Sequence, residues 1–283
     1  MPNRALVLGG GGITGIAWEL GVLAGLAAEG VDLTAADLVI GTSAGSLVGA
    51  QVASAASGAS GTSMQDLYAA QLAGYGVEVA AHMGSGLLLR YALTLFLSRD
   101  PMRFRRRIGR LAVGAQTMPA EERLGVIAAL LPSSQWPERH LQVTAVNADT
   151  GEFRTFDRAS GVSLVEAVAA SCAVPGVYPA ISIGTGRYVD GGVRSGTNAD
   201  LADGYERIVI LAPVTKAIRP LLGVDAFVPR LRERARVVTV SPDVAAKAAI
   251  GRNFLDPARR APAAEAGWAQ ARAVAGPVRT VWE

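Results

Sequence analysis

Cysteine and histidine are scarce in this sequence, and their scarcity excludes several kinds of site. The one cysteine, Cys172, cannot form an intrachain disulfide and leaves the redox compartment open. The two histidines, His82 and His140, form no ligand spacing typical of a metal site, even together with the cysteine. We therefore expect neither a metal nor a cofactor.

Long hydrophobic runs and strong charge of either sign are also missing. The apolar stretch 87–97 contains Arg90 and is well short of the roughly 20 residues that a membrane-spanning helix needs. The net charge of +3 is small for 283 residues, so charge gives no argument for nucleic acid as a partner. The apolar run before the first glycines covers only residues 5–8, and a run of this length is too short for a signal peptide. Cytoplasmic location is the default expectation.

Small and apolar residues are what the chain has in abundance. Hydrophobic residues make up 50% of it, charged residues 18%, and glycine occurs 33 times. This composition suits a buried parallel sheet covered by helices. At this length the chain could form one large α/β domain or two small ones, and we expect a single domain over residues 1–283.

Short apolar runs alternate along the chain with segments of helical periodicity. Strands are predicted at 5–8, 38–40, 187–189, 207–211 and 236–240, and a hairpin from 141–146 and 152–156. Helices are predicted at 15–29, 44–56, 164–170, 244–250 and 257–274. Residues 57–63 indicate a loop, residues 64–131 an inserted helical cap, and residues 278–282 either a last strand or a tail. The order at the start implies parallel pairing.

A Gly-x-Ser-x-Gly motif lies at Gly41–Gly45, between the predicted strand 38–40 and the predicted helix 44–56. A strand that runs through this motif directly into a helix is typical of a nucleophile elbow, in which small neighbours allow an exposed serine on a sharp turn. The helix N-terminus behind Ser43 also favours the anionic forms that arise during acyl transfer. The alternative is a tight turn with a helix-capping serine.

Four consecutive glycines, Gly9–Gly12, follow the first predicted strand, and Gly15 follows shortly after. Such a run costs backbone entropy, which indicates N–H groups that something negative approaches closely. The segment also contains the dinucleotide fingerprint G-x-G-x-x-G. A dinucleotide site would want an acidic residue at the end of the second strand, and a P-loop would want Lys followed by Ser or Thr after the last glycine; both are absent. An oxyanion hole facing Ser43 fits best.

A histidine base for Ser43 is one alternative. Asp66 or Asp100 followed by His140 would give the order of an α/β-hydrolase triad. Only the predicted cap separates the elbow from His140, however, which matches that fold poorly. Each histidine is better explained as a surface or cap residue.

A carboxylate base is the other alternative, and Asp190 is the best placed candidate. It follows the predicted strand 187–189, and Gly191 and Gly192 come directly after it. A strand that delivers a polar residue to a glycine turn can bring Asp190 to the edge of the sheet beside Ser43.

The glycine loop Gly10–Gly15, the elbow Gly41–Gly45 and the acid in Asp190-Gly191-Gly192 together resemble the patatin-like phospholipase family. The resemblance covers residues 5–212, including the segment Val174–Pro179, and leaves 213–283 as a C-terminal strand–helix extension. It implies an α/β fold in the form of a three-layer sandwich, with a mostly parallel central sheet flanked by helices and a helical cap insertion around 64–131.

The resemblance also implies roles for the site residues. Ser43 and Asp190 would form a catalytic dyad without histidine, in which Asp190 accepts the proton of the serine hydroxyl. The oxyanion hole would come from backbone N–H groups, and the remaining glycines would support the motifs. The hole residues are Gly10, Gly11 and Gly12, and the supporting residues are Gly15, Gly41, Gly45, Gly191 and Gly192. Burial should raise the pKa of Asp190 for it to work as a base.

The implied substrate is a lipid or another acyl ester, with an acyl pocket in the cap at 64–131. Members of the family commonly carry Arg or Lys where this chain has Thr14, so a cation that could orient the loop or a lipid phosphate is missing there. The same fold would also suit a small-molecule esterase or an acyltransferase. A nucleotide-binding protein that uses the glycine loop as a phosphate cradle is a further alternative.

An arginine cluster lies within the predicted cap, at Arg103, Arg105, Arg106, Arg107 and Arg110. It could make peripheral membrane contact through anionic lipid headgroups, while Phe104 and the apolar stretch 87–97 insert at the interface. A solvated helix face with its apolar side packed on the core explains the same pattern.

Overall fold

An eight-stranded sheet forms the centre of the protein. The computed structural model describes residues 3–56, 61–74, 85–98, 100–215 and 220–283. The strand order is β5-β6-β3-β2-β1-β7-β8, with β4 also paired to β3. The strands are β1 (Arg4–Leu8), β2 (Leu38–Thr42), β3 (His140–Asn147), β4 (Phe153–Phe156), β5 (Ile181–Ile183), β6 (Gly186–Asp190), β7 (Arg207–Leu211) and β8 (Arg236–Val240).

The pairing is parallel in the middle of the sheet and antiparallel at one side. β1, β2, β3, β7 and β8 run parallel to their neighbours in this set, whereas β3–β4, β3–β6 and β5–β6 are antiparallel. The predicted strands are confirmed, and β5 was not predicted because three residues are too short to show a pattern. Since Leu8 pairs with Gly41, β1 and β2 end side by side at one edge of the sheet.

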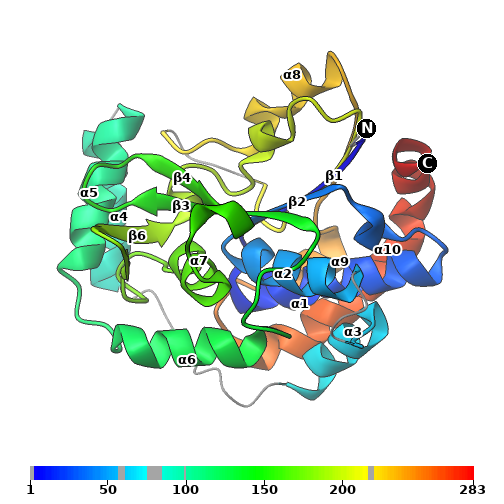
Figure 1. Ribbon diagram of the computed structural model, residues 1–283, viewed down its shortest axis with the longest axis horizontal. Helices are drawn as coiled ribbons and strands as arrows, with labels where there is room; N and C mark the ends of the chain where they lie inside the picture. Colours follow the sequence, from blue (N-terminus) through cyan, green and yellow to red (C-terminus); the bar gives the residue numbers. More distant parts are fainter. Residues whose placement is uncertain (1–2, 57–60, 75–84, 99, 216–219) are drawn as a thin grey trace.

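Helices cover both faces of the sheet, as the alternation of side chains along β1 requires. Leu6 and Leu8 pack into the larger core with α1, α2, α7 and α10, whereas Ala5 and Val7 pack into a second core with α8. In Figure 1, α8 lies above the sheet and α1, α2 and α7 lie below it. The three-layer α/β prediction is therefore confirmed. The bounds are α1 (Gly12–Ala28), α2 (Ala44–Ala56), α7 (Leu164–Ser171), α8 (Val228–Arg232), α9 (Val244–Ile250) and α10 (Arg260–Trp282).

The C-terminal helix α10 packs along α1, and a buried bond from Trp18 Nε1 to Gln270 Oε1 (3.0 Å) joins the two helices. The helix continues through Pro277 to Trp282, so the prediction of a last strand or tail at 278–282 is wrong. A proline inside a helix usually breaks it, but here the burial of the last turn outweighs that preference. Trp282 is buried and its Nε1 donates to the carbonyl oxygen of Asp32 at 2.8 Å, which holds the last turn against the core.

The predicted insertion is helical throughout its described residues. It contains α3 (Met64–Ala73), α4 (Ser85–Leu97), α5 (Pro101–Val113) and α6 (Ala120–Leu130). These helices are distributed around the fold: α3 contacts α1 and α10, α5 contacts β6, and α6 contacts α7. The predicted loop residues 57–60, His82 and residues 75–84 and 99 of the insertion lie outside the described residues. No helix in the described part is long and apolar enough to cross a membrane.

Candidate active site

Ser43 occupies a strained turn between β2 and α2, as the elbow motif predicts. Its backbone φ is +53°, a left-handed conformation that costs a non-glycine residue on the order of 1–3 kcal/mol. Gly45 is required by the same turn, because a Cβ there would lie 2.1 Å from the carbonyl oxygen of Leu8. The motif therefore folds as a sharp strand–turn–helix junction.

The C-terminal end of α7 holds this turn in place. The backbone N–H of Ser43 donates to Ser171 Oγ at 2.9 Å, and its carbonyl oxygen accepts from Cys172 Sγ at 3.2 Å. Ser46 Oγ donates to the same carbonyl at 2.6 Å. These bonds leave the Ser43 hydroxyl as the part of the residue that is available to a substrate.

Asp190 ends β6 and meets Ser43 across the sheet. β6 pairs with β3 at Ala145, and β3 pairs with β2 at Thr42, so both strands deliver their polar ends to one place. The Ser43 side chain lies close enough to the Asp190 carboxyl group to lower its pKa, and the Gly192 N–H donates to Asp190 Oδ1 at 2.7 Å. The side chain is buried, and burial raises the pKa of Asp190 to about 6, although Ser43, the Gly192 bond and Arg123 lower it.

The glycine loop packs directly against the elbow. The Gly45 N–H donates to the carbonyl oxygen of Gly9 at 3.0 Å. The Gly10 N–H is engaged elsewhere, because it donates to the carbonyl oxygen of Gly196 at 2.7 Å. Gly10 therefore does not supply the expected free donor, which corrects that part of the prediction. In the described part of the chain no acceptor binds the N–H of Gly11 or Gly12, and Gly12 lines the cavity in front of Ser43.

Glu19 anchors the start of the glycine loop from inside the protein. Its Oε1 accepts from the Gly9 N–H at 2.9 Å, and the whole residue is buried. Burial raises the pKa of Glu19 well above its usual value, against the smaller effect of the Gly9 bond. Burial therefore favours the neutral carboxylic acid form of this side chain.

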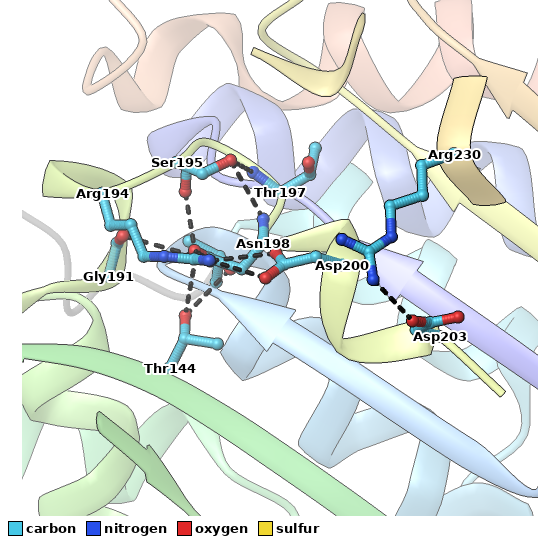
Figure 2. A network of polar contacts seen from close by, with 10 residues as sticks. Thr144, Gly191, Arg194, Ser195, Thr197, Asn198, Asp200, Asp203 and Arg230 are labelled. Carbon is cyan, nitrogen blue, oxygen red and sulfur yellow. Dashed lines mark hydrogen bonds and ion pairs between the residues drawn. The ribbon is translucent and has the colours of Figure 1, made fainter. Parts of the chain in front are cut away.

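A polar network joins the loop after Asp190 to β2 and β3, and Figure 2 shows the network from close by. At its centre, Asn198 Nδ2 donates to Thr42 Oγ1 and to the carbonyl oxygen of Ser195, both at 3.0 Å. Arg194 Nη1 donates to Asn198 Oδ1 at 2.7 Å, and its guanidinium binds both oxygens of Asp200. Thr42 precedes Ser43, so the network fixes the elbow relative to the loop after Asp190. We define the polar network as Thr42, Thr144, Gly191, Arg194, Ser195, Thr197, Asn198 and Asp200.

A cavity of about 250 Å³ opens in front of Ser43. Its walls are mostly apolar and come from α1, α2, α6 and the segment after α7. We call this cavity the acyl pocket; its apolar lining includes Ile13, Ile16, Leu47, Val126, Ile127, Leu130, Val174, Val177 and Leu255. Two charged residues of α6, Glu122 and Arg123, line it as well. The predicted insertion therefore does contribute a wall of the pocket.

Comparison with known proteins decides the family. The model of the family described as patatin-like phospholipase matches residues 6–203, most of the chain. The protein belongs to the patatin-like phospholipase family. This membership supports lipid acyl hydrolase activity and agrees with the motifs that the sequence displays. No curated protein matches the chain.

Solved structures that resemble this patatin-like protein are remote in sequence. VipD from Legionella pneumophila is 15% identical with a TM-score of 0.45, and the match covers 98% of this chain and 67% of VipD. Full-length ExoU from Pseudomonas aeruginosa, solved with SpcU, is 17% identical with a TM-score of 0.42, covering 100% of this chain and 53% of the other. The chain thus spans about half the length of the ExoU chain it matches.

The histidine triad is not assembled in this patatin-like fold. His140 is the first residue of β3 and pairs with Leu38, roughly 13 Å along the sheet from the end of β2 that leads into Ser43. Asp66 and Asp100 instead cap the N-termini of α3 and α5. Thr14 is buried, and both its N–H and its hydroxyl donate to the carbonyl oxygen of Phe254.

The arginine cluster divides into exposed and partly buried members. Arg103, Arg106, Arg107 and Arg110 are exposed and Arg105 is half-buried, whereas Phe104 is buried at 2% exposure. Insertion of Phe104 into a membrane, as the sequence pattern suggested, is therefore wrong. Arg106 Nε donates to the carbonyl oxygen of Thr150, and Arg107 Nη1 to that of Leu97.

Sequence reasoning missed the residues that position the site. Asn198, Arg194 and Ser195 follow Asp190 within a few positions, and this polar cluster after the Asp-Gly-Gly turn was the available signal. Glu19 and Arg123 gave no local signal, because each lies in an ordinary helical pattern and gains its meaning from the packing.

Proposed function

We propose that the protein is a serine acyl hydrolase that cleaves carboxylic esters of lipids, of the phospholipase A, lysophospholipase or lipid esterase type, through Ser43 and Asp190. The pairing of β2 and β6 with β3, which brings Ser43 and the buried Asp190 carboxyl group together in front of the acyl pocket, carries this proposal. The strained backbone at Ser43 and the family membership support it.

The proposed reaction has two steps at the same pair of residues. Asp190 accepts the hydroxyl proton as Ser43 Oγ attacks the ester carbonyl carbon, and the proton then passes to the leaving alcohol. Water next attacks the acyl-enzyme, gives its proton to Asp190 and frees the acid, after which Ser43 recovers its hydroxyl. A carboxylate with a pKa of about 6 is ionised at neutral pH and is a better base than an ordinary aspartate.

The negative oxygen that forms in both steps needs hydrogen-bond donors. We propose the N–H groups of Gly11 and Gly12, since the Gly10 N–H is engaged with Gly196. Gly12 has a φ of +59°, and a Cβ there would lie 2.6 Å from the carbonyl oxygen of Phe254, so another residue would displace the loop. Fixed donors of this kind are worth about 3–4 kcal/mol to such a transition state.

The surface near the acyl pocket suits contact with a lipid surface. On α4, Leu89, Leu93, Phe96 and Leu97 are exposed at helical spacing, and Tyr91 Oη binds the carbonyl oxygen of Pro175, next to the pocket. Exposed Arg90 lies on the same helix, and Arg103 and Arg110 on α5. We propose that this apolar face, with these arginines, contacts the membrane peripherally. The replacement Phe96→Ser should weaken sedimentation with anionic vesicles but leave hydrolysis of a monomeric ester unchanged.

A substrate panel tests the proposed function. The native protein, Ser43→Ala and Asp190→Asn are compared on short-chain p-nitrophenyl esters, monoacylglycerol, lysophospholipids and phospholipids. Hydrolysis of long-chain lipid esters that both replacements abolish supports a lipid hydrolase. Turnover of the short esters alone would indicate a small-molecule esterase, and activity that survives in Ser43→Ala would refute the proposed nucleophile.

A further inference from the structure

Arg123 is a buried cation in the wall of the acyl pocket. It lies on α6 and is only 9% exposed, and its guanidinium lies 3.8 Å from the centre of the Tyr178 ring. Within the part of the chain that the structure describes, its guanidinium has no hydrogen bond or ion pair, and its Nε is buried without a partner. The ring therefore satisfies only one face of the group.

Such an arrangement is unfavourable unless something else binds the charge. A guanidinium has five N–H donors in one plane, and a donor that is buried without an acceptor, as Nε is here, costs about 1–3 kcal/mol. Stacking on an aromatic ring stabilises the charge, by about 2 kcal/mol or more when the pair is desolvated, but supplies no acceptor for the in-plane donors. The neighbouring Glu122 is exposed and forms no ion pair with Arg123, so the in-plane N–H donors of Arg123 are available to a ligand.

The position of Arg123 indicates where that ligand would lie. Arg123 lines the same pocket as Ser43, and it is the sole cation among the described residues of that lining. Its charge also lowers the pKa of Asp190 and the pKa of Cys172, both at the base of the site. A negative group bound by Arg123 would thus belong to the molecule whose ester reaches Ser43.

The form of the guanidinium selects the kind of negative group. Its planar donors match the paired oxygens of phosphate and of carboxylate, with hydrogen bonds stronger than those between neutral groups, and phosphate is the one that the proposed phospholipid and lysophospholipid substrates carry. Thr14 is buried against Phe254 and offers no charge.

We propose that Arg123 binds a phosphate group carried by the ester substrate and so determines specificity for phosphate-bearing acyl esters over neutral ones. This inference rests on the proposed acyl hydrolase function. Arg123 holds the phosphate while the apolar lining holds the acyl chain, which places the ester carbonyl between them at Ser43 Oγ. Neutral esters lack this contact and rely on the apolar lining alone.

Hydrolysis of two matched esters tests the proposal. The pair is 1-acylglycerol 3-phosphate and 1-monoacylglycerol with the same acyl chain, supplied below their aggregation limits. In Arg123→Gln, kcat/KM for the phosphate ester should fall about 10- to 100-fold, as expected for loss of hydrogen bonds to a charged group, while that for the neutral ester changes less than about threefold. Arg123→Lys should restore part of the loss. Arg272→Gln, at an exposed position on α10 outside the pocket, is the matched control and should change neither value.

An equal fall for both esters, or an unchanged ratio between them, would overturn the specificity role of Arg123 and leave the hydrolase proposal intact. If the protein hydrolyses neither ester, or if Ser43→Ala still hydrolyses them, the hydrolase proposal fails instead.

Binding then decides the role of Arg123 separately from turnover. Octyl phosphate should bind Ser43→Ala at least tenfold more tightly than Ser43→Ala/Arg123→Gln, whereas octanol should bind the two alike. Equal affinity for octyl phosphate would contradict the proposal whether or not the protein is active.

Discussion

The polar groups on the two sides of Ser43 differ in how completely they are bonded. Behind the serine, in the polar network, Arg194 binds Asn198 and both oxygens of Asp200, and its guanidinium lies 4.3 Å from the centre of the Phe153 ring. In front of it, in the acyl pocket, Arg123 lies over Tyr178 but has no acceptor in the described chain. Both arginines stack on a ring, but the less buried Arg194 uses its donors and the more buried Arg123 does not.

The difference separates groups that maintain the fold from groups that are held ready for a ligand. A polar network fixes one arrangement when its groups are bonded, and among the members of this one only the Thr197 hydroxyl is buried without a partner, whereas a buried charge without partners destabilises the folded state. Asp190 belongs with Arg123 in this respect, since its burial disfavours the charged form that the reaction needs. Replacements behind Ser43 should therefore reduce stability, and replacements in front of it should reduce activity.

Asp190→Asn should give the largest effect on the pocket side. We expect kcat/KM to fall by about a thousandfold or more, because the amide cannot accept the serine proton. Stability should move in the opposite direction. The rise of the Asp190 pKa from 3.8 to about 6 corresponds to about 3 kcal/mol lost at neutral pH, which the neutral amide would recover. Urea unfolding at pH 8 measures this, and a clear loss of stability would count against the comparison.

Arg194→Gln and Arg123→Gln form a matched pair across the serine. The first removes the donors to Asp200 and Asn198 and should lower the free energy of unfolding by about 2–4 kcal/mol. The second removes a charge that no described residue pairs with, and should leave stability within about 1 kcal/mol of the native value or raise it. Equal destabilisation in the two variants would show that Arg123 is structural too.

The pH dependence of activity should follow Asp190. Because the carboxylate must be ionised to accept a proton, kcat/KM should fall about tenfold per pH unit below pH 6 and be level above pH 7, given the pKa of about 6. Arg123 lowers this pKa, so the midpoint should shift to higher pH in Arg123→Gln. A level profile down to pH 4 would exclude Asp190 as the base.

Glu19→Gln should have the smallest effect. The raised pKa of Glu19 means that its contribution to stability is complete below the ordinary glutamate pKa and is lost as pH rises through the folded-state pKa. The amide keeps an acceptor for the Gly9 N–H and does not ionise, so the variant should equal the native protein at pH 5 and be slightly more stable at pH 9. Glu19→Ala leaves the Gly9 N–H with the carbonyl oxygen of Leu211 alone and empties a buried site, so it should lose about 1–3 kcal/mol at both pH values. Thermal unfolding distinguishes the two.

The sequence could predict those parts of the site that short motifs carry. The elbow at Ser43 and the turn after Asp190 depend on local backbone geometry, so glycine positions and flanking strands reveal them. The same local logic predicts the strands β7 and β8 at their observed bounds. Such features need no knowledge of distant contacts.

Features that depend on distant contacts could not be predicted. The Gly10 N–H is engaged by Gly196, which lies far along the chain, so counting glycines overestimated the free donors. Pro277 would normally end a helix, but burial of Trp282 outweighs that preference. The helical pattern alone places neither Arg123 nor Phe104. Only the packing shows that Arg123 lines the pocket and that Phe104 lies in the core.

Covalent trapping of the nucleophile tests the account most directly. A fluorophosphonate with an alkyl chain is incubated with the native protein, and peptide mass spectrometry locates the adduct. We predict one adduct, on Ser43, that is absent from Ser43→Ala and much slower to form in Asp190→Asn, while Arg272→Gln reacts at the native rate. An adduct on another residue, or native-rate labelling in Asp190→Asn, would contradict the central claim.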